Sequence, residues 1–263
     1  MQTSRGAADP QRSAPWTTPW PGAAVVFRQR TSSTMDDARE LARSGCPTGT
    51  VAAAGYQERG RGRVPGRAWL SPPGESLLAT VVLRIPEMGF PLAELPLRAG
   101  AAAALGIEEA AGISVQIKWP NDVVAAPPGA ASPRKLAGLL CEAHGEAALV
   151  GIGVNCGQES FPEEIASTAC SLRQCCGRLL PPRLVLSAIL ARLKSLVGSS
   201  DAWRGVVRAR LYRRGEPVRV DLLGSGEVVE GVLRDIDERG WLVLELRDGR
   251  LRAVGQGELL SSP

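Results

Sequence analysis

The pattern of apolar and polar positions predicts alternating helices and strands over the first two thirds of the chain. In residues 32–45 apolar side chains recur with helical spacing, Ser33 or Thr34 can cap the helix, and Gly45 can end it. Further helices are expected over residues 92–111 and 184–197. Short apolar runs bounded by turn residues predict strands over residues 25–27, 50–54, 77–83, 115–119, 135–143 and 147–154. Residues 123–133 are expected to contain a loop rich in Pro, Gly, Ala and Ser.

The pattern changes after about residue 203. Short strands are expected over residues 218–220, 228–233, 241–245 and 251–254, with glycines at the turns between them. This spacing predicts a small β-barrel of about five strands. We therefore expect a flexible, proline-rich leader over residues 1–22, a catalytic domain over 23–203 and a β domain over 204–263.

Composition narrows the functional classes only slightly. The chain has 263 residues, 44% of them hydrophobic, and a net charge of +4, which suits an enzyme for phosphorylated or carboxylate ligands as well as a nucleic-acid binder. Six cysteines without a CxxC spacing and a single histidine disfavour a zinc site and favour free thiols. With no secretory signal and no long apolar run, a cytoplasmic protein without membrane contact is expected.

The stretch GYQERGRGRVPGRAW, residues 55–69, is the first candidate for chemistry. It holds four arginines and three glycines within residues 59–67, followed by Trp69. Glycines permit close backbone approach and arginine forks match phosphate or carboxylate oxygens. A solvated basic loop and an RNA-binding segment are alternatives. The motif occurs once, between two predicted strands, which favours a loop that closes a pocket.

Three more motifs follow along the chain. In KWPND, Lys118 suits phosphate, Asp122 suits Mg²⁺, and Pro120 ends the strand. In RKLAGLLCE, strand alternation predicts that Lys135 shares a small, apolar face with residues 137, 139 and 141, so that it needs an anionic partner. In VGIGVNC, residues 150–156, glycines alternate with β-branched residues, which marks a place where a ligand approaches the backbone. Each motif alone also fits a turn or a solvated charge.

In this order and spacing, the motifs resemble those of biotin–protein ligases. The resemblance covers roughly residues 23–195 and includes the Ser-Thr helix start at residues 33–34, and the β-rich tail resembles the SH3-like C-terminal domain of that family. It implies an α+β fold related to class II synthetases, with a mixed sheet, flanking helices and a C-terminal β-barrel. Because the first predicted strand begins at Val25, the resemblance is to monofunctional members that lack an N-terminal DNA-binding domain, and no DNA partner is expected.

The resemblance implies ATP-dependent formation of biotinyl-5′-AMP and transfer of biotin to a lysine of a biotin carboxyl carrier protein. ATP and biotin are then substrates, Mg²⁺ assists, and the protein is a monomer or a homodimer. Two alternatives remain: a lipoate or octanoate ligase or transferase of the same fold, and a nucleic-acid-binding regulator.

The resemblance also implies a role for each matched residue. Lys135 and Arg61 are expected to be catalytic. The biotin site is expected to contain Ser33, Thr34, Gln57, Gly60, Arg61, Lys135, Gly138 and Gly153. ATP or the adenylate is expected to contact Arg63, Arg67, Trp69, Lys118, Asn121 and Asn155, with Trp69 stacking on adenine. Asp122 is expected to bind Mg²⁺. One departure lies in the loop, where Val64-Pro65 stands in place of a single residue in the usual motif.

Overall fold

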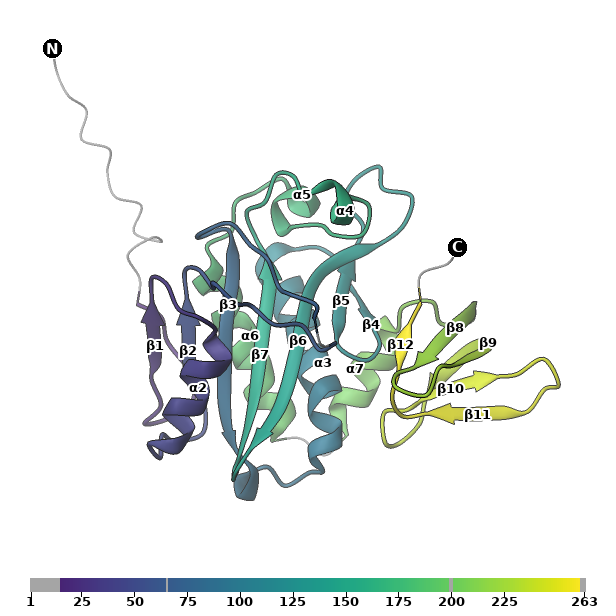
Figure 1. Cartoon of the computed structure of the whole chain (residues 1–263), viewed down its shortest axis with the longest axis horizontal. Helices are drawn as coiled ribbons and strands as arrows, with labels where there is room; N and C mark the ends of the chain where they lie inside the picture. Colours follow the sequence, from purple (N-terminus) through teal and green to yellow (C-terminus); the bar gives the residue numbers. More distant parts are fainter. Residues whose placement is uncertain (1–14, 65, 199–200, 261–263) are drawn as a thin grey trace, which may run out of the picture.

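A mixed sheet forms the centre of the molecule, as predicted (Figure 1). The computed structural model describes residues 15–64, 66–198 and 201–260. Within them the sheet has the order β1-β2-β3-β7-β6-β5-β4; only β1 and β2 pair in parallel, and the other neighbours are antiparallel. The strands are β1 (Val25–Arg28), β2 (Thr50–Ala54), β3 (Ser76–Arg84), β4 (Gln116–Lys118), β5 (Asp122–Ala125), β6 (Arg134–His144) and β7 (Ala147–Asn155).

Helices cover both faces of this sheet. The described helices are α2 (Thr34–Arg43), η1 (Ile85–Glu87), η2 (Leu92–Glu94), α3 (Leu95–Ala111), α4 (Glu163–Ala166), α5 (Leu172–Cys176), α6 (Pro182–Val197) and α7 (Ala202–Arg210). Helices α3 and α6 pack side by side on one face, and α2 packs on the other, over β2, β3 and β7 (Figure 1). None of the described helices is long and apolar enough to cross a membrane.

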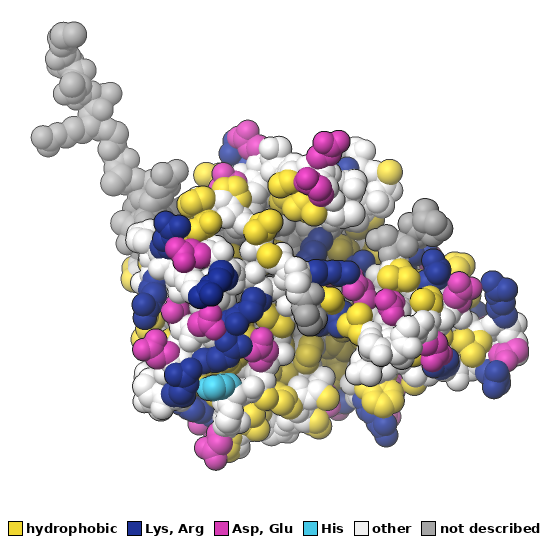
Figure 2. Space-filling view, in the orientation of Figure 1, with side chains coloured by type: hydrophobic (Ala, Val, Ile, Leu, Met, Phe, Trp, Pro, Cys, Tyr) yellow, Lys and Arg dark blue, Asp and Glu magenta, His cyan; other side chains and the backbone are white. Residues whose placement is uncertain are grey.

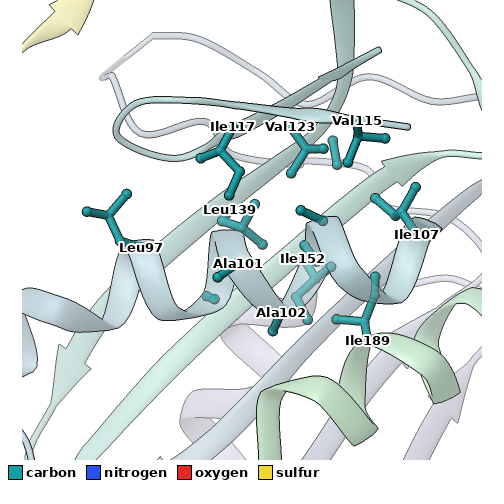
Figure 3. Packing of buried hydrophobic residues seen from close by; sticks show 14 of the residues in the cluster. Leu97, Ala101, Ala102, Ile107, Val115, Ile117, Val123, Leu139, Ile152 and Ile189 are labelled. Atoms are coloured by element: carbon teal, nitrogen blue, oxygen red, sulfur yellow. The ribbon is translucent and has the colours of Figure 1, made fainter. Parts of the chain in front are cut away.

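The main core lies between the sheet and the α3–α6 pair. Figure 3 shows the apolar side chains of α3 meeting Ile117, Val123, Leu139 and Ile152 from four strands. The two helices approach closely at Gly106, where a Cβ atom would lie 2.6 Å from the backbone of Ile189. This packing fixes β4, β5 and β6 in space, and these strands carry most of the candidate site.

The position of α2 follows from local signals in the sequence. The hydroxyl of Ser33 accepts a hydrogen bond from the backbone N–H of Met35, and two aspartates lie in the first turn, where the helix dipole favours negative charge. Met35, Ala38 and Ala42 are buried against the sheet. The predicted helix is confirmed, and its N-terminus presents Ser33 and Thr34 to the sheet.

The C-terminal unit is a five-stranded antiparallel sheet of order β11-β10-β9-β8-β12. Its strands are β8 (Pro217–Leu222), β9 (Glu227–Ile236), β10 (Leu242–Glu245), β11 (Leu251–Val254) and β12 (Glu258–Leu259). The β-rich unit is therefore confirmed, and its closure into a barrel stays a prediction. It contacts the part of the chain that forms the central sheet through a hydrogen bond from the indole nitrogen of Trp119 to the carbonyl oxygen of Gly240 (3.0 Å).

The structure bears on three further expectations. Residues 123–133 contain the expected loop, over residues 126–133, and residues 122–125 before it form β5 between β4 and β6. The expected boundary after residue 203 falls inside α7, and the domain limits stay a prediction. In the expected flexible leader, residues 1–14 lie outside the described part, but Trp16 stacks on Phe27 at 5.1 Å, because a large aromatic surface gains by burial.

Candidate active site

The arginine–glycine stretch is an ordered hairpin beside the sheet. Arg61 and Ala68 form an antiparallel bridge, and the N–H of Trp69 donates to the carbonyl oxygen of Gly60 at 3.1 Å. A Cβ atom at Gly60 would lie 2.3 Å from the carbonyl oxygen of Trp69, so the hairpin requires glycine there. The N–H of Arg67 donates to the carbonyl oxygen of Val64. Pro65 lies outside the described residues, and the effect of the extra loop residue stays a prediction.

A buried polar cluster lies at the N-terminus of α2. The backbone N–H and the hydroxyl of Thr34 both donate to Oε1 of Gln57, at 2.7 and 2.9 Å. The hydroxyl of Thr80, in β3, donates to that of Thr34 at 2.9 Å and is fully buried. Ser33, Thr34 and Gln57 line a cavity of about 40 Å³. The structure thus brings these three predicted residues together, and it adds Thr80.

Arg61 is held by α2. Its guanidinium lies 2.6 Å from the carboxylate of Asp36, which also pairs with Arg39, and Arg39 in turn pairs with Glu142 of β6. Figure 2 shows the resulting mixture of basic and acidic side chains on the face of the molecule over α2. Arg61 also lines the cavity that Thr34 and Gln57 line. The catalytic role expected for it stays a prediction.

The indole of Trp69 lies over two glycines of the sheet. A Cβ atom at Gly153 would meet the indole ring at 2.7 to 3.0 Å, and one at Gly138 would meet it at 3.0 Å. The two glycines are register partners in β7 and β6, and larger residues there would displace the ring. Gly138, Gly153 and Trp69 complete the wall of the small cavity, which holds a few water molecules at most.

Lys135 has the anionic partner that was expected, but on the opposite face of the strand from the one predicted. Its ammonium nitrogen lies 2.8 Å from Oδ1 of Asp122. The predicted face is wrong because the pairing of β5 with β6 contains a bulge: Val123 pairs with Ala137 and Val124 with Lys135, so Leu136 has no partner in register. The bulge turns Lys135 to the side of Gly138, where the ammonium group would lie 3.3 Å from an added Cβ atom.

The KWPND segment connects β4 to β5 beside Lys135. Asn121 donates from Nδ2 to the carbonyl oxygen of Leu139 at 2.9 Å, which fixes the turn against β6. Trp119 is buried, and its hydrogen bond to Gly240 ties the segment to the C-terminal unit. Lys118, Asn121 and Asp122 then lie on one wall of a second cavity, of about 130 Å³.

The second cavity is cationic. Four basic side chains and two carboxylates line it, an excess of two positive charges: Arg63, Arg67, Lys118 and Lys135 against Asp122 and Glu258. Burial lowers the pKa of Lys118 and of Arg63, and the nearby carboxylates of Asp122 and Glu258 oppose both shifts. Cations that are only partly compensated inside a cavity favour an anionic ligand.

The C-terminal unit contributes one side of this cavity. Glu258 lies 2.6 Å from the guanidinium of Arg67, and this hydrogen bond raises the pKa of Arg67. Arg63 donates to the carbonyl oxygen of Gly257 at 3.0 Å. Sequence reasoning missed Glu258 and Thr80, because a lone glutamate in a short strand and a lone threonine in an apolar strand carry no local signal of a site.

Among the predicted residues Gly60 lines neither cavity, and neither does Asn155. It is buried at the end of β7, where it donates to the carbonyl oxygen of Cys170 at 3.0 Å. Its Oδ1 accepts from Gln158 at 3.4 Å. These contacts hold the segment after β7, and the predicted contact of Asn155 with nucleotide stays a prediction.

Comparison with known proteins gives a consistent picture. Residues 27–159 match the biotin/lipoate A/B protein ligase family, and residues 215–258 match the biotin protein ligase C-terminal domain. The chain is 32% identical to the biotin–[acetyl-CoA-carboxylase] ligase of Mycobacterium tuberculosis over 91% of both chains. It is 36% identical to the bifunctional ligase/repressor BirA of Bacillus subtilis over 64% of this chain, and the alignment spans only 52% of the length of that relative.

A solved structure is similar to this chain over both the central sheet and the C-terminal unit. Biotin protein ligase from Aquifex aeolicus, in complex with biotin and ATP, is similar with a TM-score of 0.77 and 29% identity. The similarity covers 90% of this chain and 97% of the Aquifex chain, so it includes both the central sheet and the C-terminal unit.

Proposed function

The chain belongs to the biotin/lipoate A/B protein ligase family, and from this premise we propose that it is an ATP-dependent biotin–protein ligase. It activates biotin to biotinyl-5′-AMP with release of pyrophosphate. It then transfers the biotinyl group to the ε-amine of one lysine in a biotin carboxyl carrier protein. The name of the Mycobacterium relative and the ligands of the Aquifex structure support this assignment.

The observation that carries the proposal is the pair of cavities that share Trp69 as a common wall. The smaller cavity has a polar end at Thr34 and Gln57 and two glycines beneath the indole of Trp69. It holds only a few water molecules, so we propose that Trp69 moves to admit a compact bicyclic ligand with a polar head. The larger cavity is cationic, which suits phosphates. Lys135 lies between them, next to Gly138 on one side and Asp122 on the other. A carboxylate from one ligand can therefore meet a phosphate of the other near Lys135.

In the first half-reaction a carboxylate oxygen of biotin attacks the α-phosphorus of ATP, and the bond to the pyrophosphate oxygen breaks. Both reactants are anionic, so positive charge near the junction lowers the barrier. Lys135 and Arg61 supply it near the carboxylate, while Arg63, Arg67 and Lys118 supply it near the phosphates. Trp69 covers the place where the carboxylate meets the α-phosphate and limits access of water to the mixed anhydride.

The residues of the larger cavity fit a magnesium ion. Mg²⁺ is usually held by one or two carboxylates together with substrate phosphates and water, and Asp122 and Glu258 are the carboxylates that line this cavity. Asn121 supplies an amide oxygen next to Asp122. A bound Mg²⁺ would neutralise charge on the phosphates and on the departing pyrophosphate.

In the second half-reaction the lysine amine of the carrier protein attacks the carbonyl carbon of the adenylate. An amide forms, the bond to AMP breaks, and the amine gives up its extra proton. The arginine–glycine hairpin covers the place where the carboxylate of biotin is proposed to meet the α-phosphate. The acceptor lysine is therefore proposed to enter from the face of the molecule that carries this hairpin.

Biotin-dependent exchange of labelled pyrophosphate into ATP tests the activation step. We expect exchange with biotin and much weaker exchange with lipoate. Labelling of a purified biotin carboxyl carrier domain, detected by mass, tests the transfer step. Exchange with lipoate in preference to biotin would contradict the assignment, and acyl transfer without ATP would point to a transferase of the same fold.

A further inference from the structure

The hydrogen-bond chain Thr80–Thr34–Gln57 has only one possible direction. The backbone N–H of Thr34 can only donate, so the atom of Gln57 that lies 2.7 Å away is the carbonyl oxygen Oε1. The hydroxyl of Thr34 lies 2.9 Å from the same oxygen and must give its single proton to it. The hydroxyl of Thr80, 2.9 Å from that of Thr34, must then supply its own proton.

This direction determines what the cavity offers to a ligand. Oε1 of Gln57 receives two hydrogen bonds, so the amide is fixed with its NH₂ end turned away from Thr34. The oxygen of Thr34 accepts from Thr80 and donates to Gln57, which leaves it one lone pair. Thr34 therefore offers one acceptor at the cavity that it lines with Gln57, and Gln57 offers a pair of donors on the side of Gly60.

We propose that Thr80 is a positioning residue for biotin, whose buried hydroxyl fixes the direction of the Thr34–Gln57 hydrogen bonds to match a cyclic urea. A cyclic urea carries N–H donors beside a carbonyl acceptor, which complements the lone pair of Thr34 and the NH₂ of Gln57. Lipoate has no such group. The inference rests on the proposed function, because it requires biotin as the ligand of the smaller cavity.

Burial makes the hydroxyl of Thr80 effective. Thr80 is 0% exposed in the centre of β3, on the sheet face that α2 covers, so water cannot replace its hydroxyl when the group is removed. Hydrogen bonds in such a chain polarise one another, and a missing donor weakens the next bond. A neutral buried hydrogen bond contributes about 1 kcal/mol, so its loss corresponds to a change in biotin affinity of roughly tenfold at most.

The test compares Thr80→Val and Thr80→Ser in the full chain. Val keeps the branched shape but removes the proton donor, whereas Ser keeps the donor and removes a methyl group. We expect calorimetric titration with biotin to give a dissociation constant for Thr80→Val that is raised by about three- to tenfold, and a nearly unchanged one for Thr80→Ser. In the exchange assay KM for biotin rises for Thr80→Val while kcat at saturating biotin is unchanged.

A double-mutant cycle with Thr34→Val separates this role from simple packing. When Thr34 has no hydroxyl, Thr80→Val should cause little further loss of biotin affinity. Wild-type affinity in Thr80→Val, equal losses in the Val and Ser variants, or additive losses in the cycle would each overturn the inference. If the wild-type chain binds no biotin, the proposed function itself fails, and that result is distinct from the other three.

Discussion

The ammonium nitrogen of Lys135 lies 2.8 Å from the carboxylate of Asp122 in the wall of the larger cavity, beside Gly138 in the wall of the smaller one. The pair holds the ammonium group of Lys135 on the side of the strand that carries Gly138. An anionic ligand competes with Asp122 for the ammonium group, and the carboxylate then becomes available to a cation. One ion pair thus couples the proposed phosphate contact to the proposed Mg²⁺ contact.

Replacing Lys135 by Gln should slow adenylate formation by roughly a hundred- to a thousandfold, because one positive group aimed at the developing charge is lost. The measurement is biotin-dependent pyrophosphate exchange at saturating ATP. Lys194 offers a matched control, since it is exposed near the end of α6 and its ammonium group donates to the carbonyl oxygen of Pro19. Exchange in Lys135→Gln equal to that in Lys194→Gln would rule out the catalytic role.

Local signals predicted much of this site, and long-range pairing determined the rest. The cap at Ser33 and the acidic first turn predict α2 correctly, because a helix terminus is encoded within a few residues. Alternation along residues 135–143 predicts β6 but places Lys135 on the wrong face, because the bulge at Leu136 depends on pairing with β5. Glu258 reaches the site only through the docking of the C-terminal unit, which no local pattern encodes.

The thiol of Cys156 should resist alkylation while the protein is folded. Burial raises its pKa from 9.0 to about 12, and iodoacetamide reacts with the thiolate. Peptide mass spectrometry after treatment at about pH 8.5 should find Cys156 unmodified in buffer and modified in urea, whereas the partly exposed Cys46 reacts in both.

The same thiol makes stability depend on pH. Between pH 9.0 and about 12 the thiol of Cys156 ionises in the unfolded chain but not in the folded one, so this group lowers the free energy of unfolding as the pH rises. Rapid labelling of folded Cys156 would contradict its burial.

Replacing Arg67 by Gln should raise KM for ATP without a measurable loss of stability. Its side chain is 62% exposed, and an exposed ion pair such as that with Glu258 contributes at most about 1 kcal/mol. Its charge nevertheless faces the cavity in which phosphates are proposed to bind. The control is Arg247→Gln, which removes an even more exposed arginine of the C-terminal unit. If both variants have the same KM for ATP, Arg67 does not contact the nucleotide.

Replacing Trp119 by Phe should weaken ATP binding, because it removes a hydrogen bond between the KWPND segment and the C-terminal unit. Phe fills most of the same space but cannot donate to the carbonyl oxygen of Gly240, and an unsatisfied buried carbonyl costs about 1–3 kcal/mol. We expect a lower free energy of unfolding in urea and a higher KM for ATP, since Lys118 and Asn121 lie beside Trp119. Trp241→Phe is the control, because that indole is 36% exposed at the surface of the C-terminal unit. An unchanged KM for ATP in Trp119→Phe would show that docking does not position the segment.

Adding a methyl group at Gly153 should reduce biotin binding far more than it reduces stability. The new Cβ atom would lie 2.7 to 3.0 Å from the indole of Trp69, so the ring must move away from Gly153. The added methyl group also takes up space in the smaller cavity. Gly205→Ala is the matched control: no atom lies within 4 Å of its Cβ position on α7, and alanine there should stabilise the helix by about 0.5–1 kcal/mol. Trp fluorescence and calorimetric titration with biotin distinguish the two variants. We expect a shifted emission and a raised dissociation constant for Gly153→Ala alone. Wild-type affinity in Gly153→Ala would contradict a biotin site bounded by Gly153 and Trp69.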